Sequence, residues 1–254
     1  MIFDTHVHSM VSPDSEMHPQ EAIAILAEKG LGCTFTEHID YNTQGVPFFC
    51  ADLDAYPRDY IQYKSDTVRL GLEISLIPQC ISQNTAHAAH QDIDYIIGSI
   101  HWIDGWDIYH AKDYFAQSGD KVYDRYLSYA LEMVKLNDFF DVLGHIDYIS
   151  RYSSLPEKNI LYEKYADAYD ALLKALIERD KLLELNTSRL GDENACKNLF
   201  AIYSRYRDLG GRYVTIGSDS HNTGKLGYKF DKALEMIDEI GLKPVHFKNR
   251  QMII

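Results

Sequence analysis

Several features that define whole classes of proteins are rare or missing in this sequence. The four cysteines, Cys33, Cys50, Cys80 and Cys196, show no CxxC spacing, which argues against a zinc ribbon and against a disulfide framework. No apolar stretch is long enough to span a membrane. We therefore expect buried, reduced thiols and a cytoplasmic location, with no membrane partner.

Positive charge is also scarce. The 254 residues include 25 Lys and Arg against 38 Asp and Glu, which gives a formal net charge of -13. Such a surface repels phosphate backbones, so nucleic acid is not an expected partner. A small anionic substrate is compatible with this charge, because bound divalent ions can reverse the field locally. The oligomeric state is not indicated.

The chain has no low-complexity tract, no Pro/Gly linker and no internal repeat. Residues 1–254 are therefore expected to form one domain, and the 46% apolar content is normal for a globular protein. The first residues read as a strand that leads directly into Asp4, so no signal peptide is expected.

Short apolar runs alternate with longer amphipathic ones, which is the pattern of parallel β/α units. Strands are predicted at residues 2–6, 32–36, 72–77, 95–99, 141–145, 182–186 and 213–217. Helices are predicted at residues 19–29, 53–70, 120–137, 161–179, 193–209 and 225–240. About seven units favour an α/β barrel, although alternation alone also allows an open, doubly wound sheet.

The pair His6 and His8 on the first predicted strand is the most informative feature. Residues i and i+2 of a strand point to the same face, so the two imidazoles form half of a metal site. Ligand-type residues recur at or near the carboxyl ends of five further strands: His38, Glu73, His101, His145, Asp219 and His221. Barrel active sites form at these ends, so the joint pattern predicts a metal-dependent hydrolase.

Six short motifs carry these residues in order along nearly the whole chain. They are Asp4-Thr5-His6-Val7-His8-Ser9, Thr36-Glu37-His38, Gly71-Leu72-Glu73, Gly98-Ser99-Ile100-His101, Gly144-His145-Ile146-Asp147 and Ser218-Asp219-Ser220-His221. They resemble the polymerase and histidinol phosphatase (PHP) family, and the layout is most similar to its stand-alone histidinol-phosphate phosphatase branch. The resemblance implies a distorted (β/α)7 TIM-like barrel with three divalent metal ions, Zn, Mn or Fe.

The resemblance also implies how the ions share their ligands. The expected sets are His6, His8, Glu73 and Asp219 for one ion; Glu73, His101 and His145 for a second; and Asp14, His38 and His221 for the third. Some relatives have a histidine at the position of Asp14. A carboxylate is an equally good ligand for a harder ion, so this departure alters metal preference more than it threatens the site.

The implied reaction is hydrolysis of the phosphomonoester L-histidinol phosphate to L-histidinol and phosphate, a step of histidine biosynthesis. A hydroxide bridging the ions that Glu73 joins would attack phosphorus in line, and Asp219 is assigned as the acceptor of the water's proton. The alternative is a PHP phosphoesterase acting on a nucleotide, a sugar phosphate or a phosphotyrosine. A regulatory module without catalysis is disfavoured, because all nine expected ligand positions hold ligand-type residues.

Two arginines are candidates for binding the substrate phosphate. Arg151 and Arg189 follow the fifth and sixth predicted strands, in loops that should open onto the metal centre. A guanidinium presents a planar fork that can grip phosphate oxygens bidentately. Ordinary surface ion pairs are the alternative, and the resemblance favours the functional role.

Two further segments leave alternatives open. Residues 103–119 carry Trp106, Tyr109, Tyr114 and Phe115, which would either wall the substrate pocket or pack over the barrel rim. In the first case Asp104 or Asp107 would suit a cationic amine. His110 in the same segment is predicted to be a surface residue more than a pocket residue. The apolar segment 244–254 would either close the barrel or pair with another subunit.

Overall fold

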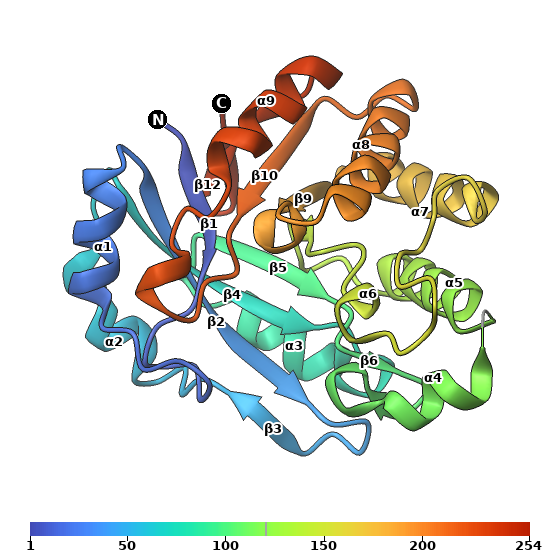
Figure 1. Cartoon of the computed structure of the whole chain (residues 1–254). Helices are drawn as coiled ribbons and strands as arrows, with labels where there is room; N and C mark the ends of the chain where they lie inside the picture. Colours follow the sequence, from blue (N-terminus) through green and yellow to red (C-terminus); the bar gives the residue numbers. More distant parts are fainter. Residues whose placement is uncertain (120) are drawn as a thin grey trace.

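The protein is built on seven parallel strands, as seen in a computed structural model that describes residues 1–119 and 121–254 (Figure 1). In sheet order these strands are β1 (Phe3–Val7), β2 (Gly32–Tyr41), β4 (Val68–Ser75), β5 (Tyr95–Ser99), β8 (Val142–Leu143), β9 (Leu182–Asn186) and β10 (Tyr213–Gly217). The first and last of them meet at their carboxyl ends through a parallel bridge between Val7 and Ser220. The Asp219 amide also donates a hydrogen bond to the His6 carbonyl at 2.8 Å.

This arrangement confirms the distorted (β/α)7 TIM-like barrel. All residues of β1, β4 and β5 are buried, and a strand covered on both faces can carry consecutive apolar residues, as Tyr95, Ile96 and Ile97 do in β5. The strands of the barrel differ in length, since β8 has two residues and β2 has ten. Gly144 follows β8 where neighbouring side chains leave no room for a Cβ atom, which would lie 2.7 Å from Ile97 Cγ2 and from Ser99 Oγ.

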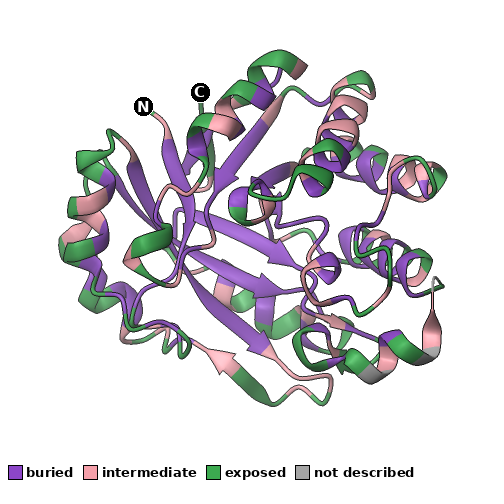
Figure 2. Ribbon diagram, viewed as in Figure 1, coloured by how far each residue is buried: buried purple, intermediate pink, exposed green. Residues whose placement is uncertain are grey.

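Helices surround the strands with their buried faces inward (Figures 1 and 2). They are α1 (Pro19–Glu28), α2 (Tyr56–Tyr60), α3 (Ile81–Ala88), α4 (Lys112–Ser118), α5 (Lys121–Leu136), α6 (Ile149–Tyr152), α7 (Ala166–Glu178), α8 (Glu193–Asp208) and α9 (Phe230–Ile240). In α5 the buried residues Val122, Tyr126, Ala130 and Met133 recur every three or four positions. Among the described residues, no helix combines the length and the apolar character that crossing a membrane requires.

Several predicted elements need correction. The helix predicted at 53–70 is wrong in its second half, because α2 and a 3-10 turn at Ile61–Tyr63 are followed by β4 from Val68. The apolar residues Val68, Leu70 and Leu72 recur with a period of two, which is a strand pattern. The strand predicted at 141–145 covers only β8, and the one at 32–36 extends to Tyr41. The helix predicted at 120–137 is found as α5, and Asp120 lies outside the described residues.

Some short elements were not predicted at all. Strand β3 (Pro47–Cys50) pairs antiparallel with β2, and β6 (Trp102–Ile103) forms a small hairpin with β7 (Trp106–Asp107). Helices α3, α4 and α6 are also absent from the prediction. All of them are eight residues or shorter, and they hold too few turns for a periodic pattern.

The C-terminal segment folds over the amino end of the barrel. After β11 (Lys243–Pro244), which pairs with β10, strands β12 (His246–Lys248) and β13 (Gln251–Ile253) form a hairpin. Its two turn residues, Asn249 and Arg250, have φ angles of +51° and +62°, as in a type I′ turn. Two aromatic rings of the hairpin stack on the first residues of two barrel strands. His246 stacks on Phe3 of β1, and Phe247 stacks on Tyr95 of β5. The segment therefore closes its own barrel, the first of the two roles considered.

Candidate metal centre

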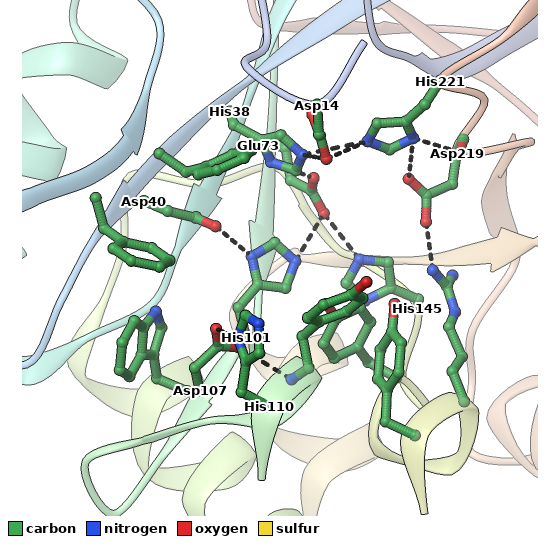
Figure 3. A pocket seen from close by; sticks show the side chains of 17 residues that line it. Asp14, His38, Asp40, Glu73, His101, Asp107, His110, His145, Asp219 and His221 are labelled. Carbon is green, nitrogen blue, oxygen red and sulfur yellow. Dashed lines mark hydrogen bonds and ion pairs between the residues drawn. The ribbon is translucent and has the colours of Figure 1, made fainter.

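The nine predicted ligand residues converge at the carboxyl end of the barrel, and Figure 3 shows all of them except His6 and His8. Eight of them lie in or directly after six strands: His6 and His8 (β1), His38 (β2), Glu73 (β4), His101 (β5), His145 (β8), and Asp219 and His221 (β10). Asp14 comes from the loop between β1 and α1. Four overlapping groups of His, Asp and Glu are close enough to hold a metal ion, and eight of the nine predicted residues occur in them.

Four atoms form the most compact group. The His6 Nε2 atom lies 3.1 Å from His8 Nε2, 3.3 Å from Glu73 Oε2 and 3.5 Å from Asp219 Oδ1. The His8 Nε2 atom lies 3.4 Å from the same Glu73 oxygen and 3.5 Å from the same Asp219 oxygen. Ligands at about 2.0–2.1 Å from a tetrahedral ion are separated by about 3.3–3.4 Å. The cage therefore has the dimensions of a tetrahedral site.

The second oxygen of Glu73 faces a different pair of imidazoles. Its Oε1 atom lies 2.8 Å from His145 Nε2 and 3.3 Å from His101 Nε2, and it accepts a hydrogen bond from Ser99 at 2.7 Å. The carboxylate points between these two rings in Figure 3. One buried carboxylate thus reaches two separate groups of potential ligands.

The third group lies nearer to solvent. The Asp14 Oδ2 atom is 3.0 Å from His221 Nε2 and 3.5 Å from His38 Nε2, and these two nitrogens are 3.4 Å apart. The Asp14 side chain is 39% exposed, in contrast to Glu73 at 1%. The ring of His8 stacks between those of His38 and His221, which ties this group to the first one.

Hydrogen bonds on the far side of the rings determine which nitrogen faces inward. His6 Nδ1 is 2.6 Å from Glu184 Oε1, His8 Nδ1 is 3.1 Å from the Ser12 hydroxyl, and His101 Nδ1 is 2.9 Å from Asp40 Oδ2. Each ring then turns its Nε2 lone pair toward the cluster, as metal-ligating histidines do. The four inward-facing atoms of the compact group can all act as acceptors, so they repel one another. A cation between them would relieve this repulsion.

Three carboxylates that support the cluster, Glu184, Glu37 and Asp40, were not predicted as functional residues. Glu184 also accepts a hydrogen bond from the His145 amide at 2.8 Å, and Glu37 accepts hydrogen bonds from Ser9 and Ser12 at 2.5 Å each. Asp40 lies two residues after His38 in β2. The available signal was a charged residue inside an apolar strand, since Glu184 interrupts the run of leucines in β9 and is fully buried.

The electrostatics of the cluster favour bound cations. Burial and the neighbouring His38 and His221 lower the pKa of His8 to about 4, so this ring is neutral at pH 7. Burial opposes ionisation of Glu73, but the charges of His6 and His101 outweigh it and hold the pKa well below its usual value. Among the described residues, Glu73 Oε2 has no hydrogen-bond partner. The neutral ring of His8, the ionised Glu73 carboxylate and its unpartnered oxygen fit divalent metal ions.

The backbone at Asp219 has an unusual conformation. Its φ of +57° lies in the left-handed region, which a non-glycine residue adopts only when its surroundings compensate for the strain. Here the amide is held by the His6 carbonyl, and Oδ2 accepts a hydrogen bond from Arg151 Nη1 at 2.6 Å. These contacts aim Oδ1 at His6 and His8.

A cavity of about 320 Å³ opens beside the cluster and is lined in part by the predicted ligands. Arg151 reaches this cavity, and its guanidinium lies over the Tyr148 ring with Nε and Nη2 unpartnered among the described residues. Arg189 is not among the described residues of the lining. It pairs instead with Asp147 and, at 2.5 Å, with the Asn159 side-chain oxygen.

Aromatic residues form the outer wall of the cavity, but few are those expected. Tyr109 lines it, whereas Phe115 is buried in the core and Trp106 stacks on Tyr114. The other aromatic residues of the lining are Phe48, Phe49, Trp102, Tyr148 and Tyr152.

Polar residues complete the mouth of the cavity. His110 is 70% exposed and also lines the cavity, with Nδ1 at 2.8 Å from Asp107 Oδ2. Asp107 belongs to the lining too, whereas Asp104 pairs with Arg125 away from it. Of the two acidic residues considered, Asp107 is therefore the one beside the cavity.

Comparisons with known proteins agree with this geometry. Residues 4–188 match the PHP domain family. The chain is 41% identical to a probable histidinol-phosphatase of Clostridium acetobutylicum over 99% of each chain, and 27% identical to a histidinol-phosphatase of Lactococcus lactis over 94% of this chain and 91% of the relative. A crystal structure of histidinol phosphate phosphatase from Lactococcus lactis, complexed with zinc, L-histidinol and phosphate, superposes with a TM-score of 0.92. It has 26% identity and covers 100% of this chain and 99% of the other.

Proposed function

Because this chain belongs to the PHP domain family, we propose that it hydrolyses L-histidinol phosphate to L-histidinol and phosphate, using three divalent ions of Zn, Mn or Fe. The observation that carries the proposal is the position of Glu73. Its two buried oxygens face two separate histidine groups beside a cavity of small-molecule size. The likeness over the full chain to a phosphatase crystallised with L-histidinol and phosphate supports this substrate.

The proposed ligands follow the three groups of atoms described above. They are His6, His8, Glu73 and Asp219; Glu73, His101 and His145; and Asp14, His38 and His221. Bound divalent ions supply activation of water at neutral pH and neutralisation of charge on phosphoryl oxygens. The residues of the chain have the remaining tasks of binding, orienting and moving protons.

Asp219 and Arg151 are proposed to act together. Oδ1 of Asp219 faces the compact group and is assigned to hold the proton of the attacking water, while Oδ2 is held by Arg151. Arg151 lines the cavity and has two nitrogens without a hydrogen-bond partner among the described residues, so its side chain is suited to grip phosphate oxygens. Arg189 stays a predicted substrate-binding residue. Its pairing with Asp147 and Asn159 supports at least a positioning role in the loop after β8.

The cavity suits the leaving group of this substrate. Aromatic rings from β3, β6 and α6 would pack against an imidazole, and the carboxylates of Asp40 and Asp107 would attract a cationic amine. A small substrate also agrees with the net charge of -13, which disfavours nucleic acid. We place the reaction in histidine biosynthesis, in the cytoplasm, in a single-domain enzyme.

The test is phosphate release from L-histidinol phosphate beside a panel of nucleotide, sugar and tyrosine phosphates. The protein is chelated first and then reloaded with Mn, Zn or Fe. We expect a kcat/KM on the order of 10⁴ M⁻¹s⁻¹ or more for L-histidinol phosphate, well above the kcat/KM of every panel compound. A higher value for one of the panel compounds would keep the phosphatase and reject the substrate. No turnover with any metal would reject both.

A further inference from the structure

A second cavity lies at the amino end of the barrel, away from the metal centre. It has a volume of about 480 Å³ and is lined by Lys64, Ser65, Asp66, Arg69, Asp94, Lys248 and Asn249. These residues lie before or at the start of β4 and β5 and in the turn of the C-terminal hairpin. We call this cavity the basic pocket, because three of its seven residues are cationic.

Arg69 is a buried cation without a carboxylate partner. The residue is 4% exposed, and its guanidinium donates hydrogen bonds to the carbonyl oxygens of Ser65, Asp66 and Val68. Among the described residues, no carboxylate forms an ion pair with it and its Nε atom has no hydrogen-bond partner. A buried charge is costly unless a counter-charge lies close by, so the positive charge of Arg69 is open to an anion.

The other charges of the pocket do not cancel this one. Lys64 Nζ lies 3.0 Å from the buried Asp94 carboxylate, so these two neutralise each other. Lys248 lies 3.6 Å from Asp66, whose side chain is 99% exposed, and water screens such a pair strongly. Among the described residues, Arg69 is therefore the cation of this pocket that has no carboxylate partner, and Lys248 has one only across a solvent-screened contact.

The positive charges of the pocket also act on the neighbouring residue His246. Burial together with the charges of Arg69, the chain amine and Lys248 lowers the pKa of His246 to about 4. This concentration of positive charge is a local exception in a chain of net charge -13. The lining carries three cations and two carboxylates, and this excess of positive charge suits an anionic group such as phosphate.

We propose that the basic pocket binds a small dianion of the phosphate type, either inorganic phosphate or the phosphate of a monoester. The Lys64 and Lys248 ammonium groups and the Ser65 hydroxyl line the pocket as donors, and Arg69 lies at its floor. This site is independent of the reaction at the metal centre, and of the function proposed for it.

The experiment is a titration of the zinc-loaded protein followed by two-dimensional NMR of the backbone amides of Ser65 and Asn249. The titrants are inorganic phosphate and methylphosphonate, a monoester mimic that cannot be hydrolysed, with chloride at matched ionic strength as the reference. We expect saturable shifts of both amides. Tighter binding of methylphosphonate would assign the pocket to a monoester, and equal or tighter binding of phosphate would assign it to the free ion.

Two variants make the test specific. Lys248→Ala should weaken binding about tenfold, the effect of losing one charge-assisted hydrogen bond. Lys243→Ala removes the same charge from β11, outside the pocket, and should leave binding unchanged. Shifts no larger than those caused by chloride, or equal affinities of Lys248→Ala and the unaltered protein, would overturn the proposal. Both variants should retain phosphatase activity, which separates this test from that of the metal centre.

Discussion

The two ends of the barrel both contain buried charge, and they resolve it in different ways. At the amino end, Asp94 accepts hydrogen bonds from two backbone amides and a lysine, and Asp141 is paired with Arg250 through two contacts of 2.7 and 2.9 Å. At the carboxyl end, Glu73 and Asp219 face imidazole nitrogens that are themselves acceptors. The carboxylates at the amino end are satisfied by protein atoms alone, whereas those at the carboxyl end are suited to bind cations.

This contrast separates stability from function within one fold. Satisfied charges at the amino end tie the C-terminal hairpin to β4, β5 and β8 and hold the barrel together. Incompletely satisfied charges at the carboxyl end mark the place where a ligand supplies the missing interactions, as in other barrels. Substitutions at the two ends should therefore affect different measurements.

The largest effect is expected for Glu73→Gln. The amide cannot supply the negative charge that both histidine groups face, so kcat/KM for L-histidinol phosphate should fall about a thousandfold or more. Steady-state kinetics and elemental analysis of bound metal check this together. Near-normal turnover with a full metal content would remove Glu73 from its proposed place between two ions.

Arg151→Met should follow with a loss of about a hundredfold in kcat/KM, because one donor to the phosphoryl oxygens disappears. The metal content should stay the same, since Arg151 contacts a carboxylate and not an ion in this scheme. Arg189→Met in the same assay tests the second predicted phosphate contact. If Arg151→Met lost bound metal in proportion to its activity, the residue would support the cluster and not bind substrate.

Glu184→Gln should lower metal affinity about 10- to 100-fold, as loss of a carboxylate behind a metal-bound histidine usually does. Competition with a chromogenic chelator measures this effect. At saturating metal the activity should recover most of its value, in contrast to Glu73→Gln. Unchanged metal affinity would mean that the 2.6 Å contact with His6 has no part in holding the ring.

Arg250→Ala tests the amino end of the barrel and should have the smallest effect on catalysis of the four substitutions. Loss of the pair with Asp141 should reduce the free energy of unfolding by about 2 kcal/mol. The substitution leaves the strain of the positive φ unchanged, and kcat/KM should stay within about twofold of the unaltered protein. Arg58→Ala, in a 68% exposed ion pair, is the control in the same urea titration and should change stability by less than about 0.5 kcal/mol. Equal destabilisation by both variants would contradict the structural role of Arg250.

Sequence alone predicted the barrel because apolar strand runs and amphipathic helices are local patterns. The candidate ligands were predictable for a related reason, since carboxyl ends of parallel strands meet wherever the strands lie in the chain. The pairing of His6 with Glu184, 178 positions apart, depends on which strands become neighbours across the ring, and no local pattern encodes it.

The errors also have physical causes. The boundary within 53–70 was missed because Arg69 stands between Val68 and Leu70 in β4, and its burial depends on carbonyls that only the folded loop presents. From their place in the sequence, Tyr114 and Phe115 would either wall the pocket or pack over the barrel rim. Phe115 turns into the core, and β3, too short to be predicted, supplies Phe48 and Phe49 instead.

The seam between β1 and β10 has a consequence for how the protein is made. His6 and His8 leave the ribosome about 200 residues before Asp219 and His221, and the Val7–Ser220 bridge joins them only afterwards. At usual rates of translation the early histidines wait about 10–40 s for their partners. The compact four-residue set can therefore be completed only after Asp219 has emerged, and metal binding there would stabilise the closed ring as a late step in the folding of this domain.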